Sequence, residues 1–140
     1  MVLYAESSAV LAWLLGEPGS DAVLHALRDA EHVVSSALTS VECSRALTRA
    51  RMLERLTRLQ ELAALQLFDQ LESTWHIQAL DSRVTARARE PMPGDPVRTL
   101  DALHIASACT LRDAVGPVTI LSRDTRVRMC AEGLGFQVLP

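Results

Sequence analysis

The chain has 140 residues, of which 49% are hydrophobic and 22% are charged, and its formal net charge is −3. This composition predicts a globular core and excludes a wholly disordered chain. The length is that of one domain, so we expect residues 1–140 to form a single domain. The small net charge neither requires nor excludes a polyanionic partner. All 14 basic residues are arginine, which suits phosphate binding, although a base-composition bias in the genome also explains it.

Three cysteines, Cys43, Cys109 and Cys130, lie far apart in the sequence and form no CxxC pair. We expect them to be reduced and buried, in a cytoplasmic protein. The N-terminus has no basic segment followed by an apolar one, and no apolar run approaches the roughly 20 residues of a membrane-spanning helix. The sequence therefore predicts neither secretion nor a membrane partner.

Short apolar runs alternate with helical patterns along the whole chain. In chain order, the expected elements are a strand at residues 2–5, a helix at 9–15, a helix that opens at Ser20 or Asp21, a strand at 32–35, helices at 39–52 and 54–72, a strand at 74–77, a helix at 81–89, a helix at 99–111, a strand at 118–121, a helix that follows residues 122–124 and ends at Gly133, and a strand at 136–139. Ser7 or Ser8 is expected to cap the first helix, and the third and fourth helices are expected to form a hairpin. Strands that alternate with helices predict an α/β protein with a parallel sheet covered on both faces. Such a sheet binds ligands at the carboxyl ends of its strands.

Four acidic residues stand at four junctions between these elements. Glu6 follows the first strand, and Glu42 lies in the first turn of the helix after the second strand. Asp101 lies in the first turn of the helix at 99–111, and Asp124 lies between the fourth strand and its helix. In a parallel sheet, all such junctions can face one edge. The pattern therefore predicts that the four acids converge on one site.

Carboxylates that lie within a few ångströms of one another repel, and a bound divalent cation removes this repulsion. Oxygen-only ligands suit the hard ions Mg²⁺ and Mn²⁺. Such an ion polarises a phosphodiester, lowers the pKa of a bound water and stabilises the leaving oxygen. The sequence thus predicts a nuclease site in which Glu6, Glu42, Asp101 and Asp124 bind the metal and carry out catalysis.

Each of these acids also has a structural interpretation, which does not exclude metal binding. Glu42 follows Thr39 at the spacing of a capping box, and Asp124 is placed to cap its helix. The negative charge of Asp101 is stabilised by the dipole of its helix. The structural interpretation of Glu6 is a solvated side chain at the end of a strand.

The helix at 99–111 is apolar almost all round, which is typical of a helix buried on every side. It nevertheless carries Asp101 near its start and His104 one turn later. An ionised carboxylate that is buried without a partner is strongly unfavourable, so Asp101 is expected either to pair with His104 or to share a metal. His104 itself is expected to be a hydrogen-bonded core histidine rather than a metal ligand.

Four arginines lie close in sequence to the acids. Arg45 and Arg49 are one helical turn apart after the second acid, and Arg123 and Arg126 flank the fourth. They are candidate contacts for RNA phosphates, and the alternative is an ordinary solvated helix face. The chain has only two Trp, one Tyr and two Phe residues. Base stacking therefore contributes little, and a folded RNA is favoured over a single strand.

These motifs resemble those of PIN-domain proteins of the VapC toxin type, over nearly the whole chain. The most specific stretch is RTLDALHIASA at residues 98–108. Further resemblances lie at residues 4–11, at Val41 and Glu42 with Arg45 and Ala46, at residues 121–126 and at residues 133–139. The resemblance implies a three-layer α/β/α PIN-like domain with a short-stranded, mainly parallel central sheet.

The same resemblance implies a Mg²⁺- or Mn²⁺-dependent endoribonuclease, the toxin of a type II toxin–antitoxin pair, which a cognate antitoxin protein silences. It also implies a homodimer that cleaves structured RNA such as tRNA or rRNA. Carried over to this chain, the family's four metal-binding acids fall on Glu6, Glu42, Asp101 and Asp124.

One position departs from the family pattern, which has aspartate at the first acid where this chain has Glu6. The additional methylene moves the carboxylate roughly 1.5 Å further from the backbone. This leaves open an alternative in which catalysis is weakened or lost and the domain binds RNA or a partner. An unrelated small α/β binding domain is less well supported, because no Gly-rich phosphate loop follows the first strand.

Overall fold

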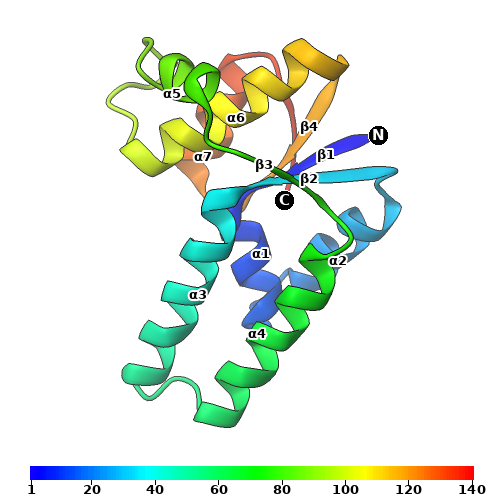
Figure 1. Cartoon of the computed structure of the whole chain (residues 1–140), viewed down its shortest axis with the longest axis vertical. Helices are drawn as coiled ribbons and strands as arrows, with labels where there is room; N and C mark the ends of the chain where they lie inside the picture. The colour runs from blue at the N-terminus through cyan, green and yellow to red at the C-terminus, as the bar shows by residue number, and fades with distance from the viewer.

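The structure is a computed structural model that describes residues 1–140. Its elements in chain order are β1 (Val2–Ala5), α1 (Ser7–Leu14), α2 (Ser20–Asp29), β2 (His32–Ser36), α3 (Ala37–Met52), α4 (Arg58–Glu72), β3 (His76–Gln78), α5 (Ser82–Ala88), α6 (Thr99–Val115), β4 (Val118–Leu121), α7 (Thr125–Gly133) and β5 (Gln137–Leu139). The five strands form one parallel sheet in the order β3-β2-β1-β4-β5. Helices cover both of its faces (Figure 1). The predicted three-layer α/β/α fold is therefore confirmed.

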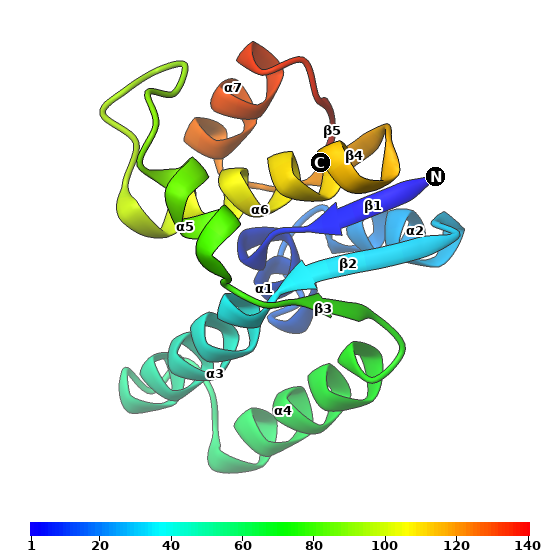
Figure 2. The same ribbon diagram turned by 45° about the horizontal axis from the view of Figure 1, so that its top comes forward.

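Side chains that alternate along β1 and β4 divide the core into two halves. Tyr4 and Ile120 pack with apolar residues of α5, α6 and α7. Leu3, Ala5 and Leu121 pack with apolar residues of α1 to α4 on the opposite face. Figure 2 shows the helices of the two halves on either side of the sheet. Because apolar side chains fill both faces of the sheet, polar functional side chains are expected where the strands end.

The first helix begins two residues earlier than expected because of its cap. Glu6 has an extended backbone, and its carboxylate accepts the N–H of Ser8 at 3.1 Å, so Glu6 is the N-cap and α1 begins at Ser7. The prediction that Ser7 or Ser8 caps this helix is wrong. Both serines lie inside the first turn, and their hydroxyls donate to Glu6.

The third helix also begins earlier than expected, because the hydroxyl of Ser36 accepts the N–H of Leu38 at 3.0 Å. Thr39 is not the cap that its spacing to Glu42 indicated. Its hydroxyl is buried and accepts a hydrogen bond from Ser35 at 2.8 Å. The capping-box interpretation of Glu42 is therefore wrong, and its carboxylate has a different partner, described below.

The predicted α3–α4 hairpin is confirmed (Figure 1). However, α4 begins at Arg58, four residues later than predicted, where Thr57 and Gln60 form a capping box. The central helix α6 continues to Val115 and ends at Gly116, whose φ of 89° favours glycine. None of the helices is long and apolar enough to span a membrane.

All strands run in the same direction, so their carboxyl ends lie along one edge of the sheet. The helices α1, α3 and α7 begin at this edge, directly after β1, β2 and β4. α6 also begins there, because its far end leads through a short turn into the start of β4. The fold thus brings the starts of four helices, and the four predicted acids that they carry, to one edge.

Candidate active site

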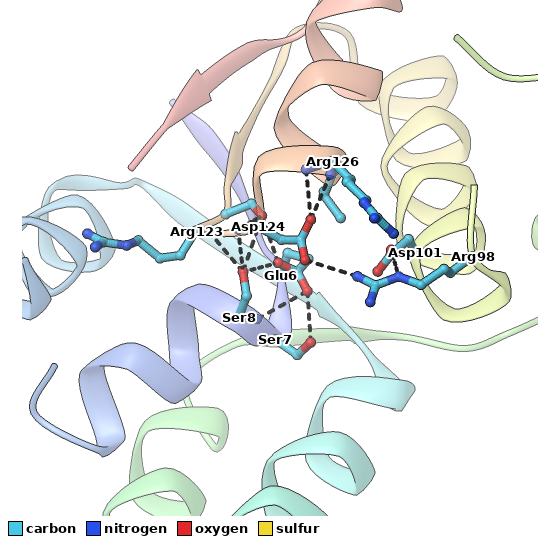
Figure 3. A network of polar contacts seen from close by, with 10 residues as sticks. Glu6, Ser7, Ser8, Arg98, Asp101, Arg123, Asp124 and Arg126 are labelled. Carbon is cyan, nitrogen blue, oxygen red and sulfur yellow. Dashed lines mark hydrogen bonds and ion pairs between the residues drawn. The ribbon is translucent and has the colours of Figure 1, made fainter. Parts of the chain in front are cut away.

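Glu6 is a buried carboxylate at the end of β1 that only uncharged groups contact. It is 3% exposed, so the expectation of a solvated side chain is wrong. One carboxylate oxygen accepts the hydroxyl of Ser7 at 2.8 Å and the N–H of Ser8 at 3.1 Å. The other accepts the hydroxyls of Ser122, at 2.7 Å, and of Ser8. These four donors replace the water that burial removes, and they hold Glu6 in one position (Figure 3).

Two of these serines join Glu6 to the junction after β4. Ser8 Oγ accepts the N–H groups of Arg123 at 2.9 Å and of Asp124 at 3.1 Å. Ser122 Oγ also accepts the N–H of Asp124, at 3.2 Å. Each hydroxyl donates to the carboxylate and accepts from the backbone, so the positions of the first and fourth predicted acids depend on each other.

A guanidinium lies between two of the predicted acids. Arg98, the residue before α6, donates from Nε to Asp101 Oδ2 at 2.9 Å and from Nη2 to Asp124 Oδ2 at 3.1 Å (Figure 3). The hydrogen bond that Arg98 donates to Asp101, followed by the charges of Asp101 and Asp124, raises the pKa of Arg98 above its usual range. The side chains of Asp101 and Asp124 are 13% and 27% exposed. The space between these two acids therefore accommodates a cation.

Asp124 divides its two carboxylate oxygens between two roles. Oδ1 accepts the N–H groups of Arg126 at 2.9 Å and of Val127 at 3.1 Å, which makes Asp124 the N-cap of α7. Oδ2 contacts Arg98. The capping interpretation of Asp124 is confirmed, and it leaves one oxygen directed away from the helix toward a cation.

A buried histidine holds Glu42. His104 Nε2 lies 2.5 Å from Glu42 Oε1, and His104 Nδ1 lies 2.8 Å from the hydroxyl of Tyr4. Burial raises the pKa of Tyr4 well above its usual range, so this hydroxyl keeps its proton. When Tyr4 donates to Nδ1, the Nε2–H of His104 donates to Glu42. The prediction of a hydrogen-bonded core histidine is confirmed, but the predicted pairing with Asp101 is wrong.

The four acids therefore fall into two groups. Asp101 and Asp124 share Arg98, and Glu6 is linked to the junction of Asp124, whereas Glu42 is held separately. As the side chains stand, no three Asp, Glu, His or Cys residues form a cluster that could hold a metal ion. The donor set nevertheless suits Mg²⁺ or Mn²⁺, because every donor is an oxygen and two of the acids already bind one cation between them.

The sequence prediction gave no role in the site to Arg98 or Tyr4. Arg98 was recognisable in principle, because it stands three residues before Asp101 and such pairs meet on one helix face. The partner of Tyr4, His104, is 100 positions away in the sequence. No local pattern could indicate that contact.

The four candidate RNA-binding arginines have different surroundings. The guanidinium of Arg123 donates to a backbone carbonyl in the turn between α1 and α2, and its side chain extends away from the acids (Figure 3). The side chain of Arg126 extends toward the acids instead (Figure 3). Arg45 and Arg49 are exposed on α3, where they line a hollow of about 560 Å³. Of the pair that flanks the fourth acid, only Arg126 lies on the side of the site.

The fold agrees with comparisons with known proteins. The sequence model of the PIN domain matches residues 3–132, so the chain belongs to the PIN domain family. It is 34% identical to Ribonuclease VapC46 of Mycobacterium tuberculosis over 137 residues, which are 98% of this chain and 95% of that relative.

Two crystal structures share the fold at low sequence identity. VapBC2 from Rickettsia felis, bound to a DNA fragment from their promoter, matches with a TM-score of 0.70 and 12% identity over 99% of this chain and 97% of that one. VapC20 of Mycobacterium tuberculosis, a Sarcin-Ricin loop cleaving toxin, matches with a TM-score of 0.66 and 15% identity over 99% of both chains. The resemblance to PIN domains of the VapC type is therefore confirmed.

Proposed function

We propose that this protein is a ribonuclease toxin: a metal-dependent endoribonuclease of a type II toxin–antitoxin pair that hydrolyses RNA phosphodiesters. Its relative VapC46 is a ribonuclease, and VapC20, which shares its fold, cleaves the Sarcin-Ricin loop. The observation that carries the proposal is an excess of carboxylates at one edge of the sheet. Glu6, Asp101 and Asp124 lie in one hydrogen-bonded network, and Arg98 is the only cationic side chain that bonds to them.

The proposed cofactor is Mg²⁺ or Mn²⁺, with Glu6, Glu42, Asp101 and Asp124 as its ligands and as the catalytic residues. When bound, the ion polarises the phosphodiester and lowers the pKa of a bound water. Asp101 and Asp124 present one oxygen each to a shared cation position. Glu6 fixes the turn that carries Asp124, and His104 sets the orientation of Glu42.

The proposed partners are a cognate antitoxin protein, an RNA such as tRNA or rRNA, and a second copy of this chain in a homodimer. The structure of VapBC2, whose fold this chain shares, supports the antitoxin. Exposed arginines support the RNA: Arg126 extends toward the acids, and Arg45 and Arg49 follow Glu42 on α3. Arg123, whose guanidinium binds a backbone carbonyl, is less well placed. The homodimer rests on the resemblance to the family alone.

We also propose that residues 1–140 form a single PIN domain that acts in the cytoplasm. The family match over residues 3–132 and the one continuous sheet support the single domain. The three free cysteines, all of them buried, support a reducing compartment.

Cleavage of a structured RNA in the presence of Mn²⁺ tests the proposed activity. We expect Asp101→Asn to reduce the cleavage rate at least about a hundredfold, because it removes one of two carboxylates that face the cation. Asp21→Asn is the matched control, since Asp21 also lies in the first turn of a helix, on the exposed surface of α2. Equal rates for the wild type and Asp101→Asn would contradict the proposal.

One observation favours a second function, that of an RNA- or partner-binding module with weakened catalysis. Both oxygens of Glu6 are already engaged by hydroxyl and N–H donors, so Glu6 can bind a metal only if some of these bonds break. Glu6→Asp separates the two functions. If the aspartate variant gains Mn²⁺ affinity and cleavage while the wild type has little of either, the second function is correct. If the change gains nothing, the departure from the family pattern is harmless.

A further inference from the structure

A hollow of about 440 Å³ lies beside the acids, between the loop that precedes α6 and the first turns of α7. Its lining includes Pro96, Val97, Arg98, Asp101, Arg126 and Met129. Asp101 belongs both to this lining and to the acid network, so the hollow adjoins the proposed metal position directly. Its volume lies within the range of small-molecule binding sites.

Two guanidinium groups and one carboxylate supply the charged part of this lining. Arg98 is already paired with Asp101 and Asp124. Arg126 is exposed, and its guanidinium forms neither an ion pair nor a hydrogen bond within the chain, whereas its backbone N–H donates to the carboxylate of Asp124. An unpaired guanidinium at the rim of a hollow is well suited to bind a phosphate.

The remaining lining is mostly apolar. Pro96 and Val97 form one side, on the loop, and Met129 lies on the other side, on α7. Met129 is 65% exposed, so its thioether side chain is open to a ligand. An inorganic anion would gain nothing from these apolar walls. A ligand that carries a phosphate at one end and a ring system at the other would use both parts of the lining.

The loop wall of the hollow is fixed by contacts within the chain. The carboxylate of Asp95 accepts the N–H groups of Met92 at 2.8 Å and of Val97 at 3.2 Å. Pro93 packs so closely on the end of α7 that a Cβ at Gly133 would lie 2.7 Å from it. The loop is therefore attached to α7, and the hollow is formed before any ligand binds.

We propose that this hollow binds one nucleotide of the RNA substrate, next to the phosphodiester that the acids act on. Arg126 contacts the phosphate of this nucleotide, and Val97 and Met129 pack against its ribose and base. The proposal rests on the proposed ribonuclease function for the identity of the ligand as part of an RNA.

An NMR titration of the full, isotopically labelled chain with 5′-AMP, 5′-UMP and inorganic phosphate tests this subsite. We expect both nucleotides to shift the amide signals of Val97, Arg126 and Met129. Arg126→Gln should weaken the binding of nucleotides and of phosphate about tenfold, because a charge-assisted hydrogen bond is lost. Met129→Ala should weaken only the nucleotides. Arg28→Gln, a change of an exposed arginine in the last turn of α2, is the matched control and should change neither.

Shifts that avoid these amides, or nucleotide binding that Arg126→Gln leaves unchanged, would overturn the subsite. RNA cleavage by the same proteins separates this outcome from a failure of the proposed function. If the wild type cleaves RNA but nucleotides do not bind in the hollow, the subsite is wrong and the ribonuclease stands. If nucleotides bind there through Arg126 and Met129 but the wild type does not cleave RNA, the nucleotide site stands and the ribonuclease is wrong.

Discussion

Two networks of this molecule combine acids and arginines in opposite proportions. On the α3–α4 hairpin, one carboxylate has two guanidinium partners: Glu61 is 1% exposed and accepts from Arg58 and from Arg51, whose Nε lies 2.6 Å away. At the carboxyl edge of the sheet, one guanidinium serves two carboxylates, because Arg98 bonds to an aspartate from each of two helices (Figure 3).

This difference separates an acid that stabilises the fold from acids that can bind a further cation. The charge of Glu61 is more than balanced by its two partners, so it needs nothing from outside the chain. At the edge, Asp101 and Asp124 compete for a single arginine, and Glu6 lies beside them with no cationic partner. Like charges that are close together favour the binding of a cation.

The largest effect on stability is expected at the hairpin. Glu61→Gln should lower the free energy of unfolding by about 2 kcal/mol, because it removes the charge from two hydrogen bonds to arginine at a buried position. Urea unfolding measures this loss, and RNA cleavage by the folded protein should stay unchanged. The control is Glu54→Gln, at an exposed position between the same two helices. Equal unfolding midpoints for the two variants would remove the structural role assigned to Glu61.

A smaller effect, on RNA cleavage and metal binding, is expected at His104, the histidine that is hydrogen-bonded to Glu42. His104→Ala should lower RNA cleavage and Mn²⁺ affinity about tenfold, the usual size of the effect when the partner of a metal ligand is lost. His104→Gln should recover part of both, because its amide N–H can still donate to Glu42. A positioning role predicts this partial recovery. If alanine and glutamine variants that remain folded lose cleavage equally and keep the Mn²⁺ affinity of the wild type, His104 does not position Glu42.

The thiol of Cys43, the neighbour of Glu42, is expected to be unreactive while the protein is folded. Burial, followed by the charges of Glu42 and Glu6, raises the pKa of the Cys43 thiol to about 12. The thiolate is the reactive form, so at pH 8 a thiol reagent should label Cys43 slowly in the native protein and rapidly after unfolding in urea. Mass spectrometry of the labelled protein identifies the site. Labelling at the same rate in both states would show that Cys43 is not buried as described.

The positions of the acids followed from the sequence because they depend on local patterns. Alternating strands and helices predicted a parallel sheet, and a parallel sheet has one edge where all its strands end. Glu6, Glu42, Asp101 and Asp124 were predicted at that edge for this reason, and the family resemblance implied the same four residues. The structure places Glu6, Asp101 and Asp124 at the starts of α1, α6 and α7, as N-caps or in the first turn, but Glu42 lies in the second turn of α3 and not in the first turn as predicted.

The contacts of these acids were not predictable, because they join segments that are distant in the sequence. Arg98 and Asp124 are 26 positions apart, and His104 and Glu42 are 62 positions apart. Such contacts depend on where the fold places the start of α6 relative to α3 and α7, which no short motif specifies. The prediction for the cap of α1 was wrong for a related reason. Serine is the more usual cap, but the N-cap is Glu6, and its second oxygen accepts a hydrogen bond from Ser122, which is distant in the sequence.

Mn²⁺ binding to the full chain, measured by calorimetry, tests most directly whether the excess of carboxylates at the edge forms a cation site. The wild type and Glu61→Gln should bind Mn²⁺ equally, since Glu61 already has two arginine partners. Asp124→Asn should bind at least about tenfold more weakly, and it should stay folded because asparagine also caps helices well. Equal Mn²⁺ affinity in the wild type and Asp124→Asn would contradict the account.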